Sequence, residues 1–125
     1  MTIQELYEII GGDYAQVMRV LRMEKLVDKH IRKLTKNGVV DALLAAGEAM
    51  DPTQLFEAGH AAKGVCGNLG LTGLADAASE ITEEFRPGAV RQFSDGEIQD
   101  KLRELASLYE TTKAGIQRYE EESGK

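Results

Sequence analysis

One stretch of the chain shows which face of its helix must be buried, and it reads Gly59-His60-Ala61-Ala62-Lys63-Gly64-Val65-Cys66-Gly67-Asn68-Leu69-Gly70. It forms the second half of a helix predicted to begin near Pro52 and to end near Gly70. Residues turn by about 100° each around a helix, so apolar residues spaced by threes and fours share one face. That face consists of Leu55, Ala58, Ala62, Val65, Cys66 and Leu69. A helix with such a face must pack against a core.

His60 lies on the opposite side of this helix, about 160° from the centre of the apolar face, so its imidazole is expected in solvent. Phe56, Lys63, Gly64 and Gly67 lie around it on the exposed side. A glycine inside a helix costs about 1 kcal/mol relative to alanine. Both glycines lie beside the histidine rather than on the apolar face. Their position indicates that another molecule must approach His60 closely.

Composition restricts the class of protein. The chain has 125 residues, which suits one domain with one core, and its net charge of −6 argues against nucleic acid or an anionic membrane as a partner. No apolar run approaches the roughly 20 residues that span a bilayer, and Met1–Glu5 lacks the features of a signal peptide. The single cysteine, Cys66, excludes an internal disulfide and fits a reducing compartment. We therefore expect a cytoplasmic protein in which Cys66 is a buried packing thiol.

Short signals divide the rest of the chain into helices. Helix starts are predicted from a capping residue followed three positions later by glutamate or glutamine, or from proline at the first helical position. These starts lie at Thr2, Asp13, Asp51 and Ser94, and Thr72 is expected to cap a further helix. Stops are predicted at Gly11-Gly12, Asn37-Gly38 and Arg86-Pro87-Gly88. Another helix is expected over 39–50, and the helix that begins at Tyr14 is expected to kink near Arg22.

The last helix carries the seam of a bundle. Its apolar and small residues alternate spacings of four and three at Ile98, Leu102, Leu105, Tyr109, Thr112, Ile116 and Tyr119. No segment alternates with a period of two, and short loops make neighbouring helices antiparallel. The sequence therefore predicts an all-α fold: an antiparallel up-down four-helix bundle with additional N-terminal helical segments. We expect one domain over 1–125, with N-terminal helices in 1–36, a bundle core in 37–125, and fraying from Glu120 to Lys125.

Motifs for other chemistries are missing. The chain has no glycine-rich phosphate-binding loop and no dinucleotide-binding fingerprint. Its two histidines and one cysteine lie too far apart in the sequence to form a set of zinc ligands, so no metal site is predicted. Glu80, Glu83 and Glu84 are interpreted as a solvated helix face, and His30 as a partly buried packing histidine. The basic residues between 19 and 36 are interspersed with acids and are interpreted as surface.

An exposed imidazole suits the role of a nucleophile presented to another protein better than that of a general base. On a helix surface it has no pocket that excludes water and no acid to orient it, so it is badly placed as a general base. It is well placed to enter another protein's active site as a nucleophile, because a neutral imidazole has a free ring nitrogen. Lys63, one turn away, can offer positive charge to a transferred phosphoryl group. Gly64 and Gly67 leave a shallow strip for a partner, and Phe56 could anchor it.

These residues carry a resemblance to a known family. The run His60-Ala61-Ala62-Lys63-Gly64, followed by small residues and a helix end at Gly70-Leu71, resembles the signature of histidine-containing phosphotransfer (HPt) domains. The next helix, with Leu74 and Ile81, and the long terminal helix are also similar to that family. The resemblance covers nearly the whole chain and is clearest from Val40 to Phe85.

The resemblance implies a function. It makes His60 the residue that accepts a phosphoryl group from a receiver-domain aspartate or a histidine kinase and passes it to another response regulator. Lys63 would support the phosphoryl group, and Gly64 would give access. Magnesium and the catalytic carboxylates would belong to the receiver partner, so no cofactor is expected on this chain. It would be a phosphotransfer intermediate rather than an autonomous enzyme, and family members are often monomers.

Two positions depart from related patterns. Many HPt domains carry a glutamine on the following helix that hydrogen-bonds the histidine region, and this sequence has Thr82 at the corresponding spacing. Dimerisation helices of sensor kinases usually carry an acid directly after their histidine, and Ala61 argues against that class. Two other interpretations stay open: a helical adaptor that binds a receiver domain without phosphotransfer, and a plain structural bundle.

Overall fold

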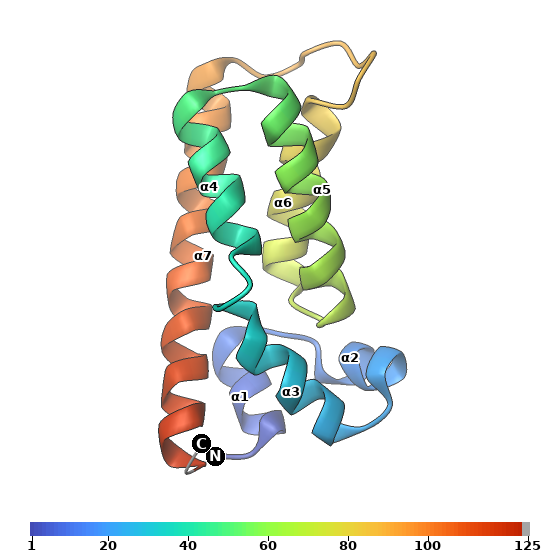
Figure 1. Cartoon of the computed structure of the whole chain (residues 1–125), viewed down its shortest axis with the longest axis vertical. Helices are drawn as coiled ribbons and strands as arrows, with labels where there is room; N and C mark the ends of the chain where they lie inside the picture. The colour runs from blue at the N-terminus through green and yellow to red at the C-terminus, as the bar shows by residue number, and fades with distance from the viewer. Residues whose placement is uncertain (124–125) are drawn as a thin grey trace.

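Residues 1–123 are described by a computed structural model, and they form seven helices and no strand (Figure 1). The helices are α1 (Ile3–Ile10), α2 (Tyr14–Leu21), α3 (Glu24–Leu34), α4 (Val39–Ala49), α5 (Pro52–Asn68), α6 (Thr72–Glu84) and α7 (Asp95–Glu122). Within this part of the chain, no helix combines the length and the apolar character needed to cross a bilayer.

Helices α4 to α7 form the bundle. They run alternately up and down, and each contacts its neighbours around the bundle, with α4 and α7 closing the ring (Figure 1). The long helix α7 extends past the other three, and the short helices α1 to α3 pack at that end, against α7 and the end of α5. The predicted all-α up-down four-helix bundle with additional N-terminal helices is confirmed.

Several predicted helix starts are confirmed in atomic detail. Thr2 and Glu5 form a reciprocal capping box, as do Ser94 and Glu97. Asp51 accepts hydrogen bonds from the backbone N–H groups of Thr53 and Gln54 at 3.0 and 3.1 Å, with Pro52 as the first helical residue. Satisfying these otherwise unpaired N–H groups stabilises the helix start by about 1 kcal/mol. The beginning of α5, and with it the register of His60, is set locally.

Two predicted helix boundaries are wrong. Arg22 adopts a left-handed backbone conformation with φ of 67° and ends α2, so the expected kink is a complete break before α3. Thr72 is the first residue of α6, and the capping position belongs to Leu71, which makes no side-chain capping bond. At both positions the spacing of apolar residues continues across the helix boundary, so this spacing alone does not show where the helix ends or begins.

The expected fraying from Glu120 onwards is also wrong for the described residues. Helix α7 continues to Glu122, because its last turns are held by charges from the N-terminal segment. Glu120 lies 3.7 Å from Arg32 and 3.6 Å from Lys36, and Glu122 lies 3.5 Å from the amino group of Met1. Gly124 and Lys125, for which fraying was also expected, lie outside the described residues.

Buried polar contacts join the N-terminal helices to the end of α5. The side chain of Tyr7 is fully buried, and its hydroxyl donates a hydrogen bond to the carbonyl of Leu69 at 2.6 Å. The Asp13 N–H donates to the carbonyl of Gly70 at 2.7 Å, and the Gln16 amide donates to the carbonyl of Gly67 at 3.0 Å. Backbone carbonyls freed at a helix end need such partners. These contacts fix the rotation of α5 and therefore the direction in which His60 points.

Candidate functional site

Helix α5 has the two faces that the sequence predicts. On the apolar face Leu55, Ala62, Cys66 and Leu69 are buried, whereas Ala58 and Val65 are half-buried at its edges. His60, on the opposite face, is exposed. The predicted exposure of this imidazole is confirmed. Burial of the opposite face of α5 keeps His60 at the surface.

Gly59 brings α6 close to the backbone beside His60. A β-carbon at Gly59 would lie only 2.5 Å from the hydroxyl oxygen of Thr82 and 3.5 Å from the carbonyl oxygen of Ala78. The Thr82 side chain is buried, and its hydroxyl donates a hydrogen bond to the Ala78 carbonyl at 2.7 Å. Thr82 therefore packs behind the histidine and is bonded to its own helix. Sequence analysis missed Gly59, although its place between the two faces of α5 was a usable signal.

Gly64 and Gly67 border open space. A β-carbon at either position would meet no atom within 4 Å outside its own helix. Gly64 is exposed and Gly67 is half-buried. Packing inside this chain does not require a glycine at these two positions, yet each lowers helix stability by about 1 kcal/mol relative to alanine. The strip that they leave beside His60 is free for another molecule.

Phe56 contacts the histidine directly. Its ring stacks on the imidazole of His60 with centroids 6.0 Å apart and an angle of 20° between the ring planes. One helical turn separates the two residues, which brings their side chains together. Phe56 is half-buried rather than fully exposed, and the guanidinium of Arg86 lies 5.4 Å from its ring centroid. The role of Phe56 as an anchor for a partner stays a prediction. Phe56 supports one side of the imidazole.

Two charged groups at the end of α6, Glu83 and Arg86, lie near His60. The exposed carboxylate of Glu83 accepts hydrogen bonds from Arg86, with Nη2–Oε2 at 2.5 Å and Nε–Oε1 at 3.2 Å. These bonds are the largest cause of a lowered pKa of Glu83, and the positive charges of Lys63 and His60 add to it. Both predicted site residues therefore act electrostatically on Glu83. Its interpretation as part of an ordinary solvated face omitted this role.

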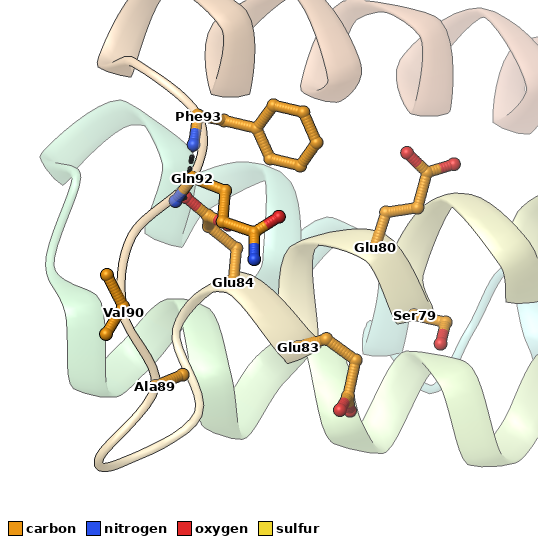
Figure 2. Close-up of a pocket in the computed structure, with 8 residues that line it drawn as sticks. All are labelled: Ser79, Glu80, Glu83, Glu84, Ala89, Val90, Gln92 and Phe93. Atoms are coloured by element: carbon orange, nitrogen blue, oxygen red, sulfur yellow. Dashed lines mark hydrogen bonds between the residues drawn. The ribbon is translucent and has the colours of Figure 1, made fainter.

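The other two glutamates have different partners. Glu80 binds Lys101 of α7 at 2.5 Å, and Figure 2 shows Glu80 and Glu83 leaving α6 in opposite directions. Glu84 is buried, so its predicted solvation is wrong. Its carboxylate accepts hydrogen bonds from the N–H groups of Gln92 and Phe93 at 2.8 and 2.7 Å. A third bond comes from Arg91 at 3.0 Å.

The bonds of Glu84 hold the segment between α6 and α7 in place. This segment and α6 enclose a pocket of about 430 Å³ (Figure 2). Its lining is acidic and apolar and includes Glu83, Val90 and Phe93, and it does not include His60. Arg86 lies at the start of the segment, so the anchored carboxylate of Glu84 also steadies the backbone from which Arg86 extends.

The second histidine lies in a different environment. His30 is exposed, so its predicted packing role is wrong: α3 lies at the margin of the bundle and turns this residue outward. It lines a groove of about 390 Å³ between α3 and α5 together with Lys33 and Val65. The predicted surface position of the neighbouring basic residues is confirmed for Arg19, Arg22, Lys25, Lys29, Lys33 and Lys36.

Cys66 and the acidic residues are candidates for a second site within residues 1–123. Cys66 is fully buried, and burial raises the pKa of its thiol to about 12, which confirms the predicted packing role. Across residues 1–123, no three side chains of histidine, cysteine, aspartate or glutamate are gathered in a way that could hold a metal ion. The groups near His60 are its own exposed imidazole, Lys63 one turn away on α5, and the ion pair of Glu83 and Arg86 at the end of α6.

Comparison with known proteins agrees with this geometry. No curated protein and no solved structure shows significant similarity to the chain. The family model described as the Hpt domain matches residues 20–115, which include α3 to α6, most of α7 and the whole motif from His60 to Leu71. This match covers more than three quarters of the sequence, and the chain belongs to the Hpt domain family.

Proposed function

We propose that this chain is a phosphorelay carrier that accepts a phosphoryl group on His60 and passes it to a response regulator. The donor would be the phosphorylated aspartate of a receiver domain or a histidine kinase. Membership of the Hpt domain family implies histidine phosphotransfer in phosphorelay signalling. The observation that carries the choice of residue is the exposure of His60 beside two glycines that border open space.

The transfer step needs little from this chain beyond access. The ring nitrogen of His60 that lacks a proton attacks the phosphorus of the aspartyl phosphate. An N–P bond forms, the P–O bond to the aspartate breaks, and the carboxylate leaves with the electron pair. The other ring nitrogen keeps its proton throughout, so no base is required on this side. Transfer to the next receiver is the same step in reverse, with a different aspartate as acceptor.

Neighbouring residues support the step in different ways. Phe56 stacks on the imidazole and limits its rotation, which reduces the number of unproductive orientations. Lys63 lies one turn from His60 on α5 and is half-buried, and its ammonium group can bind phosphoryl oxygens. Gly64 and Gly67 let the receiver's active site reach the ring without meeting a side chain.

The remaining parts of the proposal concern the partner. Magnesium and the acidic residues that bind it are placed on the receiver domain, and this chain is a carrier rather than an autonomous enzyme. We expect it to work as a monomer in the cytoplasm, with receiver domains or a hybrid kinase as its partners. The net charge of −6 does not favour binding to nucleic acid or anionic membranes.

A transfer experiment tests this function against the adaptor alternative. A panel of receiver domains is phosphorylated with a radioactive phosphoryl group, freed of small molecules and mixed with the chain. The proposal predicts rapid, acid-labile labelling of the wild type by a cognate receiver and none of His60→Gln. If His60→Gln takes up the same label, the proposal is wrong. If the wild type and His60→Gln bind the receiver equally and neither is labelled, the chain is an adaptor.

A further inference from the structure

A network of contacts leads from His60 to an arginine just beyond the end of α6. The imidazole stacks on Phe56, and the guanidinium of Arg86 lies over the same phenyl ring at 5.4 Å. Arg86 is held by Glu83 through two hydrogen bonds at 2.5 and 3.2 Å. Glu83 in turn lies within electrostatic reach of Lys63 and His60. Arg86 therefore belongs to the surroundings of His60 although 26 positions separate the two in the sequence.

Separating the ion pair between Glu83 and Arg86 costs little free energy. Both side chains are about half exposed, at 53% and 45%, and the two residues are three positions apart. Such exposed pairs contribute little to stability, because water solvates the separated charges well. Arg86 lies two residues beyond Glu84, the last residue of α6, and its exposed side chain is not confined between two helices.

A phosphoryl group on His60 would change the balance of charges here. It would add close to two negative charges beside Glu83, and like charges at short range repel. The same charge attracts the guanidinium, whose planar set of donors matches phosphoryl oxygens. We propose, on the basis of the function proposed for His60, that Arg86 releases Glu83 and binds the phosphoryl group, and thereby prolongs the lifetime of the phosphohistidine.

The effect on lifetime follows from how the phosphohistidine is lost. Water attacks phosphorus, a P–O bond forms, the N–P bond breaks, and the ring nitrogen keeps the electron pair as inorganic phosphate leaves. The nitrogen leaves more readily while the other ring nitrogen still carries its proton than after that proton has been lost to solvent. A guanidinium held beside the ring disfavours that proton, whereas the Glu83 carboxylate favours it. Arg86 and Glu83 are therefore expected to act in opposite directions.

Hydrolysis of the labelled chain tests this inference. The chain is phosphorylated by a cognate receiver, separated from it, and followed by the decay of acid-labile label at neutral pH. We expect Arg86→Gln to shorten the half-life about fivefold and Arg86→Lys to shorten it less, because an ammonium keeps the charge but loses the planar fork. Glu83→Gln is expected to lengthen the half-life about twofold. Added salt should shorten the half-life of the wild type and leave Arg86→Gln unchanged.

A matched ion pair provides the control. Arg103 and Asp100 form the same kind of exposed pair, three positions apart, on α7. Arg103→Gln is expected to leave the half-life unchanged. Equal half-lives for wild type and Arg86→Gln would overturn the inference, as would a half-life shortened by Glu83→Gln. A wild-type chain that no receiver labels would overturn the proposed function together with it, whereas normal labelling with an unaltered half-life in Arg86→Gln overturns the inference alone.

Discussion

Gly59 and Thr82 pack against each other so closely that a β-carbon at position 59 would force the Thr82 side chain to shift. The hydroxyl oxygen of Thr82 would lie 2.5 Å from that β-carbon. This contact joins α5 to α6 directly beside His60. The adjacent histidine is therefore supported from behind by packing rather than by a hydrogen bond from Thr82.

The first prediction concerns this contact. Gly59→Ala should destabilise the fold by about 1–3 kcal/mol, because the new methyl group forces α5 and α6 apart. Thr82→Ala removes the colliding oxygen, so the double variant should recover part of the loss, and a thermodynamic cycle isolates the coupling. Urea unfolding at neutral pH measures all four proteins. Gly59→Ala as stable as the wild type would contradict the packing described here.

The second prediction separates stability from access. Gly64→Ala introduces a methyl group into open space and removes a flexible residue from the interior of α5, so it should stabilise the free chain by about 0.5–1 kcal/mol. If the proposed function holds, the same methyl group obstructs the approach of the receiver domain to His60 and should slow phosphotransfer several-fold. Urea unfolding measures the change in the free energy of unfolding, and rapid mixing with a phosphorylated receiver measures the rate of phosphotransfer. Faster or unchanged transfer in this more stable variant would show that the glycine is not kept for access.

The third prediction concerns the buried thiol. Burial raises the pKa of Cys66 to about 12, so the thiolate that reacts with disulfide reagents is scarce in the folded state even at mildly alkaline pH. Its labelling should follow unfolding: slow in buffer and fast in urea. The colour released by a chromogenic disulfide measures both rates. Fast labelling in buffer, without loss of helical circular dichroism, would mean that Cys66 is exposed.

The fourth prediction is a dependence on acid. Burial of Glu84 opposes its ionisation, but hydrogen bonds from the N–H of Phe93, from Arg91 and from the N–H of Gln92 outweigh burial and lower its pKa. A lowered folded-state pKa stabilises the fold above the ordinary carboxyl pKa, and that stability is lost as the pH falls through the folded-state value. Glu84→Gln should therefore lose about 1–3 kcal/mol at neutral pH, because the neutral amide accepts these bonds more weakly.

Thermal unfolding of both proteins across the acid range measures this effect. The wild type should lose stability toward acid more steeply than Glu84→Gln, and the two should converge at low pH. Glu80→Gln is a suitable control, because Glu80 is exposed and binds Lys101 on the surface. Parallel pH curves for the wild type and Glu84→Gln would show that this carboxylate does not anchor the segment.

Much of the fold follows from local chemistry that a sequence displays. The capping boxes at Thr2 and Ser94, and the start of α5 at Asp51, involve contacts between residues two or three positions apart. The apolar face of α5 follows from helical period alone. The break at Arg22 was not predictable in this way, because a residue without a glycine's freedom adopts the left-handed conformation there, at φ of 67°.

The parts of the site that lie on another helix were harder to predict. Glu83 and Arg86 appear in the sequence as surface charges, and only the packing of α6 against α5 brings them to His60. Glu84 is one residue further along and is buried, because the segment between α6 and α7 folds back over it. His30 was misjudged for the opposite reason: its neighbours Val27 and Ile31 are buried, but the bundle leaves its own side of α3 uncovered.

The most direct measurement identifies which of the chain's two histidines carries the phosphoryl group. The chain is labelled by a phosphorylated cognate receiver, and fragments kept at neutral pH are analysed by mass spectrometry, with His30→Gln and His60→Gln treated alike. The account predicts that the fragment with His60 carries the phosphoryl group, that His30→Gln is labelled like the wild type, and that His60→Gln is not. A phosphoryl group on His30, or undiminished labelling of His60→Gln, would contradict it.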